Sequence, residues 1–194
     1  PAPNNVALSG YIWQKYSDDI GDEIRRGVVL PQQASGVPRP TLQEAFRRRE
    51  GNVEVIGWYF AVTLRQPFNP FRYPIDHETV SLRLWHQDFD KNVILTPDLE
   101  AYQLINPSLL PGLDDELVLK GWYVDRSFFS YRMHSYNANF GLKNFAEQNE
   151  VPELHFNIGL RRNFIDPLIA YLIPLTVVAC MVFVVMVIPR HDIK

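Results

Sequence analysis

Residues 168–188 read LIAYLIPLTVVACMVFVVMVI, a run of twenty-one positions without a formal charge. At about 1.5 Å of rise per residue, a helix over this run is roughly 31 Å long, close to the ~30 Å hydrocarbon core of a bilayer. The alternative is a buried core helix of a soluble protein. Such a helix usually keeps one polar stripe, whereas only Tyr171, Pro174 and Thr176 interrupt this run. We therefore predict a transmembrane helix over residues 165–189.

Basic residues flank the apolar run at both ends. Arg161 and Arg162 precede it, and Arg190 and Lys194 follow it, so both ends suit headgroups or water. Because the basic residues lie on both sides, charge does not determine the orientation of the helix. We interpret residues 190–194 as the start of a linker. The chain begins without methionine and ends soon after the apolar run, which predicts a piece of a longer protein.

The remaining residues, 1–164, suit a single domain. The whole chain is 46% hydrophobic and 13% aromatic, enough for a substantial core. Its net charge is −3, and its largest basic cluster is the three arginines at 47–49, so we expect no nucleic-acid binding. The single cysteine, Cys180, lies in the apolar run, which excludes a disulfide or a cysteine metal site within the domain.

Alternating and β-prone segments run through residues 1–164. The clearest are residues 153–160 and 80–84, in which apolar and polar side chains alternate with the period of two typical of a strand. We expect further strands at residues 6–16 (with a bulge at Gly10), 27–30, 53–64, 93–95, 117–124 and 128–136, the last two being either separate or one strand bent near Asp125.

One helix is predicted before the membrane segment. Residues 41–44, TLQE, have the form of a capping box, and acceptable helix formers follow to residue 49, so we expect one short helix that ends near Gly51. Many short strands, turn signals between them and a single short helix are typical of an antiparallel β-sandwich. The predicted fold is therefore mainly β, an immunoglobulin-like sandwich followed by a transmembrane helix.

Three motifs, taken in order, resemble the pentameric ligand-gated ion channels, the Cys-loop receptor superfamily, in its cysteine-less prokaryotic form. The first is YPID at residues 73–76 with the alternating strand after it, and the second is GWYV at residues 121–124. The third runs from LRRN at residues 160–163 to YLIP at residues 171–174. The resemblance covers about residues 68–189. It departs from the family because fewer residues than usual precede the proline loop.

The resemblance implies a channel subunit in the inner membrane of a prokaryotic cell. Its sandwich would bind a small-molecule ligand on the periplasmic or extracellular side, and identical subunits would assemble as a pentamer. The alternative is a single-pass membrane sensor with a periplasmic β-sandwich. Three further apolar runs after residue 194 would indicate a channel, and a cytoplasmic domain would indicate a sensor. No nucleophile elbow, zinc signature or phosphate loop accompanies His77, Glu78 or His134, so we expect no enzyme.

The resemblance also places the proline loop and the end of the last strand at the membrane surface. The residues that would couple the sandwich to the helix there are Tyr73, Pro74, Asp76, Arg161 and Arg162, with Pro174 in the helix itself. We expect Asp76 to pair with Arg161 or Arg162 in a charge-assisted bond. The alternative is that the two arginines only anchor the helix to headgroups. By the same analogy, residues 15–27 would face this junction.

For a ligand site, the resemblance points to aromatic residues at a subunit boundary, where ring faces suit a cationic amine. These residues are Trp85, Phe89, Trp122, Tyr123, Phe140 and Phe145. Ordinary core packing is the alternative for the two tryptophans. A hard cation such as Ca2+ would use His86, Asp88 and Asp90, although acidic loop residues are more often solvated turns. We predict no other cofactor.

Overall fold

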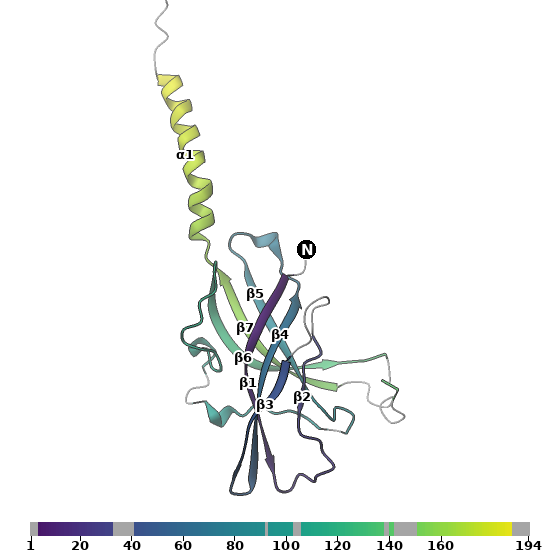
Figure 1. Cartoon of the computed structure of the whole chain (residues 1–194). Coiled ribbons are helices and arrows are strands. Elements are labelled where there is room, and N and C mark those ends of the chain that lie inside the picture. Colours follow the sequence, from purple (N-terminus) through teal and green to yellow (C-terminus); the bar gives the residue numbers. More distant parts are fainter. Residues whose placement is uncertain are drawn as a thin grey trace, which may run out of the picture.

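A computed structural model describes residues 4–32, 41–91, 93–102, 106–137, 140–141 and 151–187. These residues form two antiparallel sheets followed by one long helix (Figure 1). The first sheet has the order β1-β4-β3, with strands β1 (Asn4–Ser17), β3 (Thr41–Glu50) and β4 (Val53–Gln66). The second has the order β2-β5-β7-β6, with strands β2 (Val28–Val29), β5 (His77–His86), β6 (Trp122–His134) and β7 (Val151–Arg162).

The hydrophobic core lies where the inward faces of the two sheets meet. In the second sheet the alternation expected from the sequence is confirmed, since Val80 lies opposite Ile158 and Leu84 opposite Leu154 in antiparallel register. Side chains from β4 complete the core. Its principal buried members are Phe60, Val62, Leu64, Val80, Leu82, Leu84, Leu154, Ile158 and Leu160. Burial of the inward faces of β4, β5 and β7 therefore holds the sheets together.

The predicted helix over residues 41–49 is wrong, because this segment is strand β3. A two-residue turn joins β3 to β4, with Glu50 opposite Val53, and its Gly51 has a φ of 60° that suits such a hairpin. Arg47 also bridges Glu44 on its own strand and Glu54 on β4. The capping-box residues have only a weak local preference for helix, and pairing with β4 outweighs it.

Three smaller predictions were also tested. Residues 93–95 form no strand. The bulge expected at Gly10 is absent, since β1 pairs with β4 without a shift and Gly10 lies opposite Phe60. The segments predicted at 117–124 and 128–136 form a single strand, β6, whose register with β7 shifts between Val124 and Arg126, near Asp125; β6 begins only at Trp122, so the prediction for residues 117–121 is wrong. The loops carry short 3-10 turns, η1 (Pro70–Arg72), η2 (Leu99–Ala101) and η3 (Pro107–Leu109).

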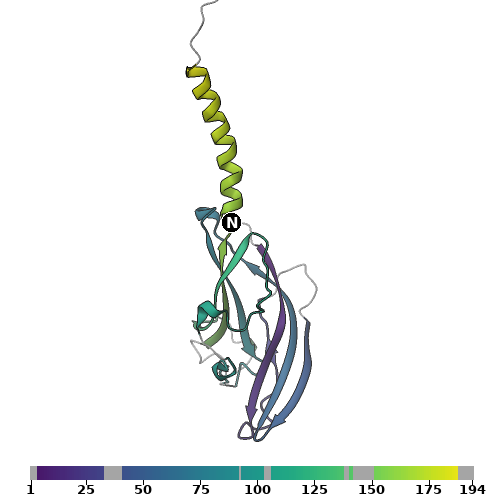
Figure 2. The ribbon, with the colours of Figure 1, turned by 90° about the vertical axis from the view of Figure 1, so that its left-hand side faces the viewer.

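Helix α1 (Ile165–Val187) begins three residues after β7 ends and projects away from the sheets (Figures 1 and 2). It is long and apolar enough to cross a membrane. None of its residues is buried, so the alternative of a core helix does not hold. The turn after β1 lies at the end of the sheets far from α1, which makes the expected placement of residues 15–27 at the junction wrong (Figures 1 and 2).

Candidate functional site: the junction between the second sheet and the helix

Three neighbouring strands bring Asp76, Arg162 and Trp122 together where the second sheet meets α1. Asp76 immediately precedes β5, Arg162 ends β7, and Trp122 lies opposite Arg162 at the start of β6. The guanidinium of Arg162 donates from Nε to Oδ1 of Asp76 at 2.5 Å and from Nη2 to Oδ2 at 2.8 Å. The backbone amide of Arg162 also donates to the Asp76 carbonyl oxygen at 3.2 Å. The two residues, 86 positions apart in sequence, therefore form a bidentate clamp.

The surroundings of the clamp favour its charged form. Asp76 is only 2% exposed. The Arg162 guanidinium lies 4.2 Å from the centre of the Trp122 ring and 5.2 Å from that of Tyr73, which adds cation–π attraction. The hydrogen bonds from Arg162 hold the pKa of the Asp76 carboxyl below its usual value, although burial opposes this. The pair is therefore ionised at neutral pH.

The chain leaves this clamp for the helix without a flexible tether. Only Asn163 and Phe164 separate β7 from α1. The Asn163 amide donates to the Gly121 carbonyl oxygen at 3.0 Å, and the Asn163 side chain accepts from the Ile165 amide at 3.2 Å. The second contact satisfies an otherwise unpaired amide at the start of the helix. The first turn of α1 is thus attached to the sheet by hydrogen bonds as well as by the chain.

The other residues predicted at the junction occupy distinct positions. Arg161 does not pair with Asp76; it lies opposite Tyr123 and His77 on the neighbouring strands, and its guanidinium is 5.9 Å from the Tyr123 ring centre. Pro74 follows Tyr73 in the loop before β5, and the peptide bond between them is cis. Pro174 lies inside α1, far along the chain from the clamp. Of the two candidate arginines, the geometry therefore selects Arg162.

The predicted aromatic site is divided between two places. Trp85, Phe89 and Phe140 cluster with Tyr136, and the ring centres are 5.3 Å apart for Trp85 and Phe89, 5.5 Å for Phe89 and Phe140, and 5.3 Å for Tyr136 and Phe140. Phe145 lies outside the described residues. A cavity of about 30 Å³ beside this cluster has room for a water molecule or two.

Trp122 and Tyr123 lie elsewhere, at the start of β6, where the second sheet meets α1. They are opposite Arg162 and Arg161, whereas Leu84, next to Trp85, is opposite Leu154. Leu154 and Arg162 are eight residues apart on β7, a distance of about 27 Å along the strand. Trp122 therefore belongs to the junction and not to the aromatic cluster.

Sequence reasoning missed Glu153, which lies under the aromatic cluster. Its carboxylate is 2% exposed and accepts hydrogen bonds from the Trp85 indole at 2.9 Å and from the Tyr136 hydroxyl. Arg83 approaches the other oxygen at 3.3 Å. Burial and the bond to Glu153 raise the pKa of Tyr136 well above its usual value. The strand pattern assigns Glu153 to the outer, polar face, and nothing in the sequence signals that the aromatic side chains cover it.

The residues considered for Ca2+ do not fit a cation site. Asp88 is fully buried and binds the Arg25 amide at 2.8 Å, the Arg25 guanidinium at 2.5 Å and Lys91 at 3.1 Å. Burial opposes ionisation, but these bonds outweigh it and lower the pKa of Asp88 to about 2. His86 uses both ring nitrogens, and Asp90 is exposed. Across the described residues, no group of three or more His, Cys, Asp or Glu is placed to hold a metal.

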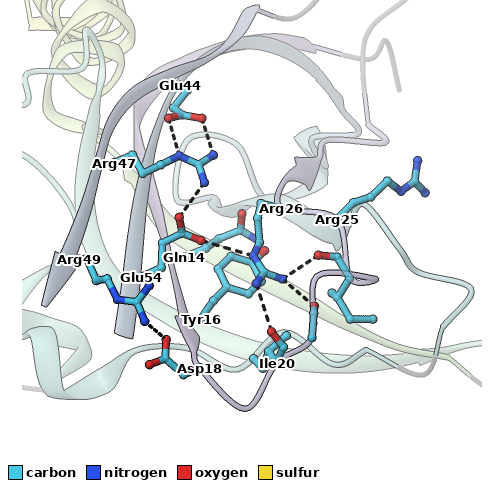
Figure 3. A network of polar contacts seen from close by, with 12 residues as sticks. Gln14, Tyr16, Asp18, Ile20, Arg25, Arg26, Glu44, Arg47, Arg49 and Glu54 are labelled. Carbon is cyan, nitrogen blue, oxygen red and sulfur yellow. Dashed lines mark hydrogen bonds and ion pairs between the residues drawn. The ribbon is translucent and has the colours of Figure 1, made fainter. Parts of the chain in front are cut away.

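A second polar network lies at the far end of the molecule (Figure 3). Arg26 donates to the backbone carbonyl of Ile24 at 2.7 Å, lies 4.3 Å from the centre of the Tyr16 ring and is 3.5 Å from Glu54. Glu54 also accepts from Arg47 on β3 at 2.8 Å. This network ties the turn after β1 to the β3–β4 hairpin, so it has an evident structural role.

A scan of the chain against protein-family models gives no match, and a search of curated proteins finds no similar sequence. The likeness to pentameric channels therefore rests on the three sequence motifs alone.

Proposed function

We propose that the chain is a subunit of a prokaryotic pentameric ligand-gated ion channel, with an immunoglobulin-like sandwich outside the membrane that transmits ligand binding to the pore through α1. The single observation that carries the proposal is the Asp76–Arg162 clamp at the start of the helix. Its two residues come from the two motifs, YPID and LRRN, that the family resemblance singles out. A sheet bonded directly to a membrane helix suits the transfer of motion from one to the other.

Strand β7 supplies a physical route between the proposed ligand site and the helix. At one end, Glu153 holds Trp85 and Tyr136 of the aromatic cluster; at the other end, Arg162 holds Asp76. We expect the ligand to be an amine, because ring faces attract cations. A ligand that rearranges the aromatic rings would shift β7 relative to β5. Because α1 begins three residues after Arg162, that shift would move the first turn of the helix.

A single-pass sensor is the second candidate function. It needs only one membrane span, and α1 is long and apolar enough to provide it. The same clamp would then pass a signal along a single helix to a partner on the other side of the membrane.

The test has two parts. Particle images of the detergent-solubilised full-length protein should show rings of five-fold symmetry, and monomers or dimers would refute the channel proposal and favour the sensor. In liposomes, ion flux should respond to some member of a panel of primary and quaternary amines. The variant Asp76→Asn should reduce the ion flux per molecule of folded, reconstituted protein, whereas Glu44→Gln, which breaks an exposed ion pair at the far end, should leave that flux intact.

A further inference from the structure

Three large apolar side chains project into solvent from the loop that precedes β5. Phe71 is 89% exposed, Ile75 is 66% exposed and Tyr73 is 47% exposed. The loop that carries them is ordered by its own hydrogen bonds: the Ile75 amide donates to the Arg72 carbonyl oxygen at 2.8 Å, and the Phe71 amide to the Asn69 side chain at 3.1 Å. A defined turn therefore holds these side chains outward.

This loop lies beside the start of α1. Figures 1 and 2, viewed at right angles, both show the η1 turn at the level of the first turn of the helix. Exposed Phe164 and Ile165 extend the apolar surface to the helix itself. We call the combined surface the apolar rim, made of Phe71, Tyr73, Ile75, Phe164 and Ile165.

We propose that the apolar rim is a second membrane contact, in which the η1 loop inserts into the headgroup region of the leaflet that α1 enters. Continuity with a helix suited to cross the bilayer identifies lipid as the occupant. Tyrosine favours the membrane–water interface, which suits Tyr73. Exposed Arg72, between Phe71 and Tyr73, and exposed Arg161, three residues before Phe164 in the chain, suit anionic headgroups. The inference requires α1 to cross a bilayer but does not depend on the channel proposal.

A second membrane contact would fix the orientation of the domain relative to the bilayer. A domain attached only through one helix can tilt about it, whereas a domain with a second contact on the bilayer cannot. The Asp76–Arg162 clamp lies between the helix and the loop and would then be held at a set height above the lipid.

Site-specific fluorescence in vesicles tests the proposal. The protein is reconstituted in phosphatidylcholine with a minority of phosphatidylglycerol and labelled at single cysteines with an environment-sensitive dye. Native Cys180 reports on α1. In a Cys180→Ser background, Phe71→Cys and Ile75→Cys report on the rim, and Ile94→Cys is the matched control. Ile94 is a similarly exposed isoleucine (58%), next to Leu95, which accepts a hydrogen bond from Tyr131 at the far end of β6.

Two quenchers separate the outcomes, iodide in the water and a nitroxide on the upper part of the lipid chain. We expect dyes at positions 71 and 75 to be quenched by the lipid nitroxide and shielded severalfold from iodide relative to the dye at position 94. Iodide quenching at 71 and 75 equal to that at 94, with position 180 quenched by lipid, would refute the proposal while leaving the transmembrane helix intact. Protection from both quenchers would assign the rim to a protein partner and also overturn it. If the lipid nitroxide failed to quench the dye at position 180, α1 would not lie in the bilayer, and the proposal would be overturned with it.

Discussion

Replacing Asp76 by asparagine should destabilise the protein substantially, because it leaves the Arg162 guanidinium without its counter-charge. Breaking a buried ion pair from one side typically costs about 3–5 kcal/mol. Here Asp76 is buried, but the Arg162 side chain is 26% exposed and keeps its contacts with Trp122 and Tyr73. Asparagine also retains one acceptor oxygen. We therefore expect a loss of about 2–3 kcal/mol in the free energy of unfolding.

The assay is urea unfolding in detergent, followed by tryptophan emission, with the midpoint falling and the slope unchanged. Glu44→Gln is the matched control, because it also removes a bidentate partner of an arginine, but with side chains that are 38% and 44% exposed. Glu44→Gln should lower the free energy of unfolding far less than Asp76→Asn does, since water screens the exposed pair. Asp76→Asn combined with Arg162→Met should recover part of the loss, because no uncompensated charge remains.

The reasoning would be refuted if Asp76→Asn lost no more stability than Glu44→Gln, or if the double variant were strictly additive.

The Asp76–Arg162 pair also predicts that the protein loses stability in acid. The folded pKa of Asp76 is below its usual 3.8, so its stabilisation is complete above that value and is lost as the pH falls through the lower folded pKa.

Three further predictions concern other parts of the molecule. Gly51→Ala should cost about 1 kcal/mol in thermal unfolding, because a Cβ there meets no atom within 4 Å and only the positive φ opposes it; no change would contradict the β3–β4 hairpin. Burial lowers the pKa of both His86 and His155 below 6.5, so the unfolded chain binds more protons just below that pH. Stability should therefore be highest above about pH 6.5 and fall at pH 5, and a flat profile would count against buried neutral histidines. Glu153→Ala should lose about 2 kcal/mol, because it leaves the Arg83 guanidinium without its counter-charge and the Trp85 indole without its acceptor, and it should change Trp85 emission; an unaltered spectrum would show that the carboxylate does not hold the indole.

Local sequence pattern predicted the elements whose identity depends on a residue and its near neighbours. The alternation around Leu82 and Leu154 indicated β5 and β7 because a strand with one buried face has a period of two. The same logic failed at residues 41–49, where a capping box indicates a helix. Strand β3 is exposed over most of its length, so it carries no apolar period, and only β4 supplies its hydrogen-bond partners.

For the junction, the residue types were predictable but their pairing was not. A carboxylate before one strand and two arginines at the end of another suggested an ion pair, yet successive residues of a strand point to opposite faces. Only the register of β7 against β5 and β6 decides that Arg162 faces Asp76 and Trp122 while Arg161 faces away.

By itself, then, the sequence determined a mainly β chain with an apolar helix long enough to span lipid, since periodicity and length are properties of contiguous residues. The tertiary structure alone decided that residues 41–50 are a strand, that Arg162 clamps Asp76, and that Glu153 is buried under Trp85 and Tyr136. Each of these depends on groups far apart in the chain, and contacts of that kind form only when the two sheets are in register and packed.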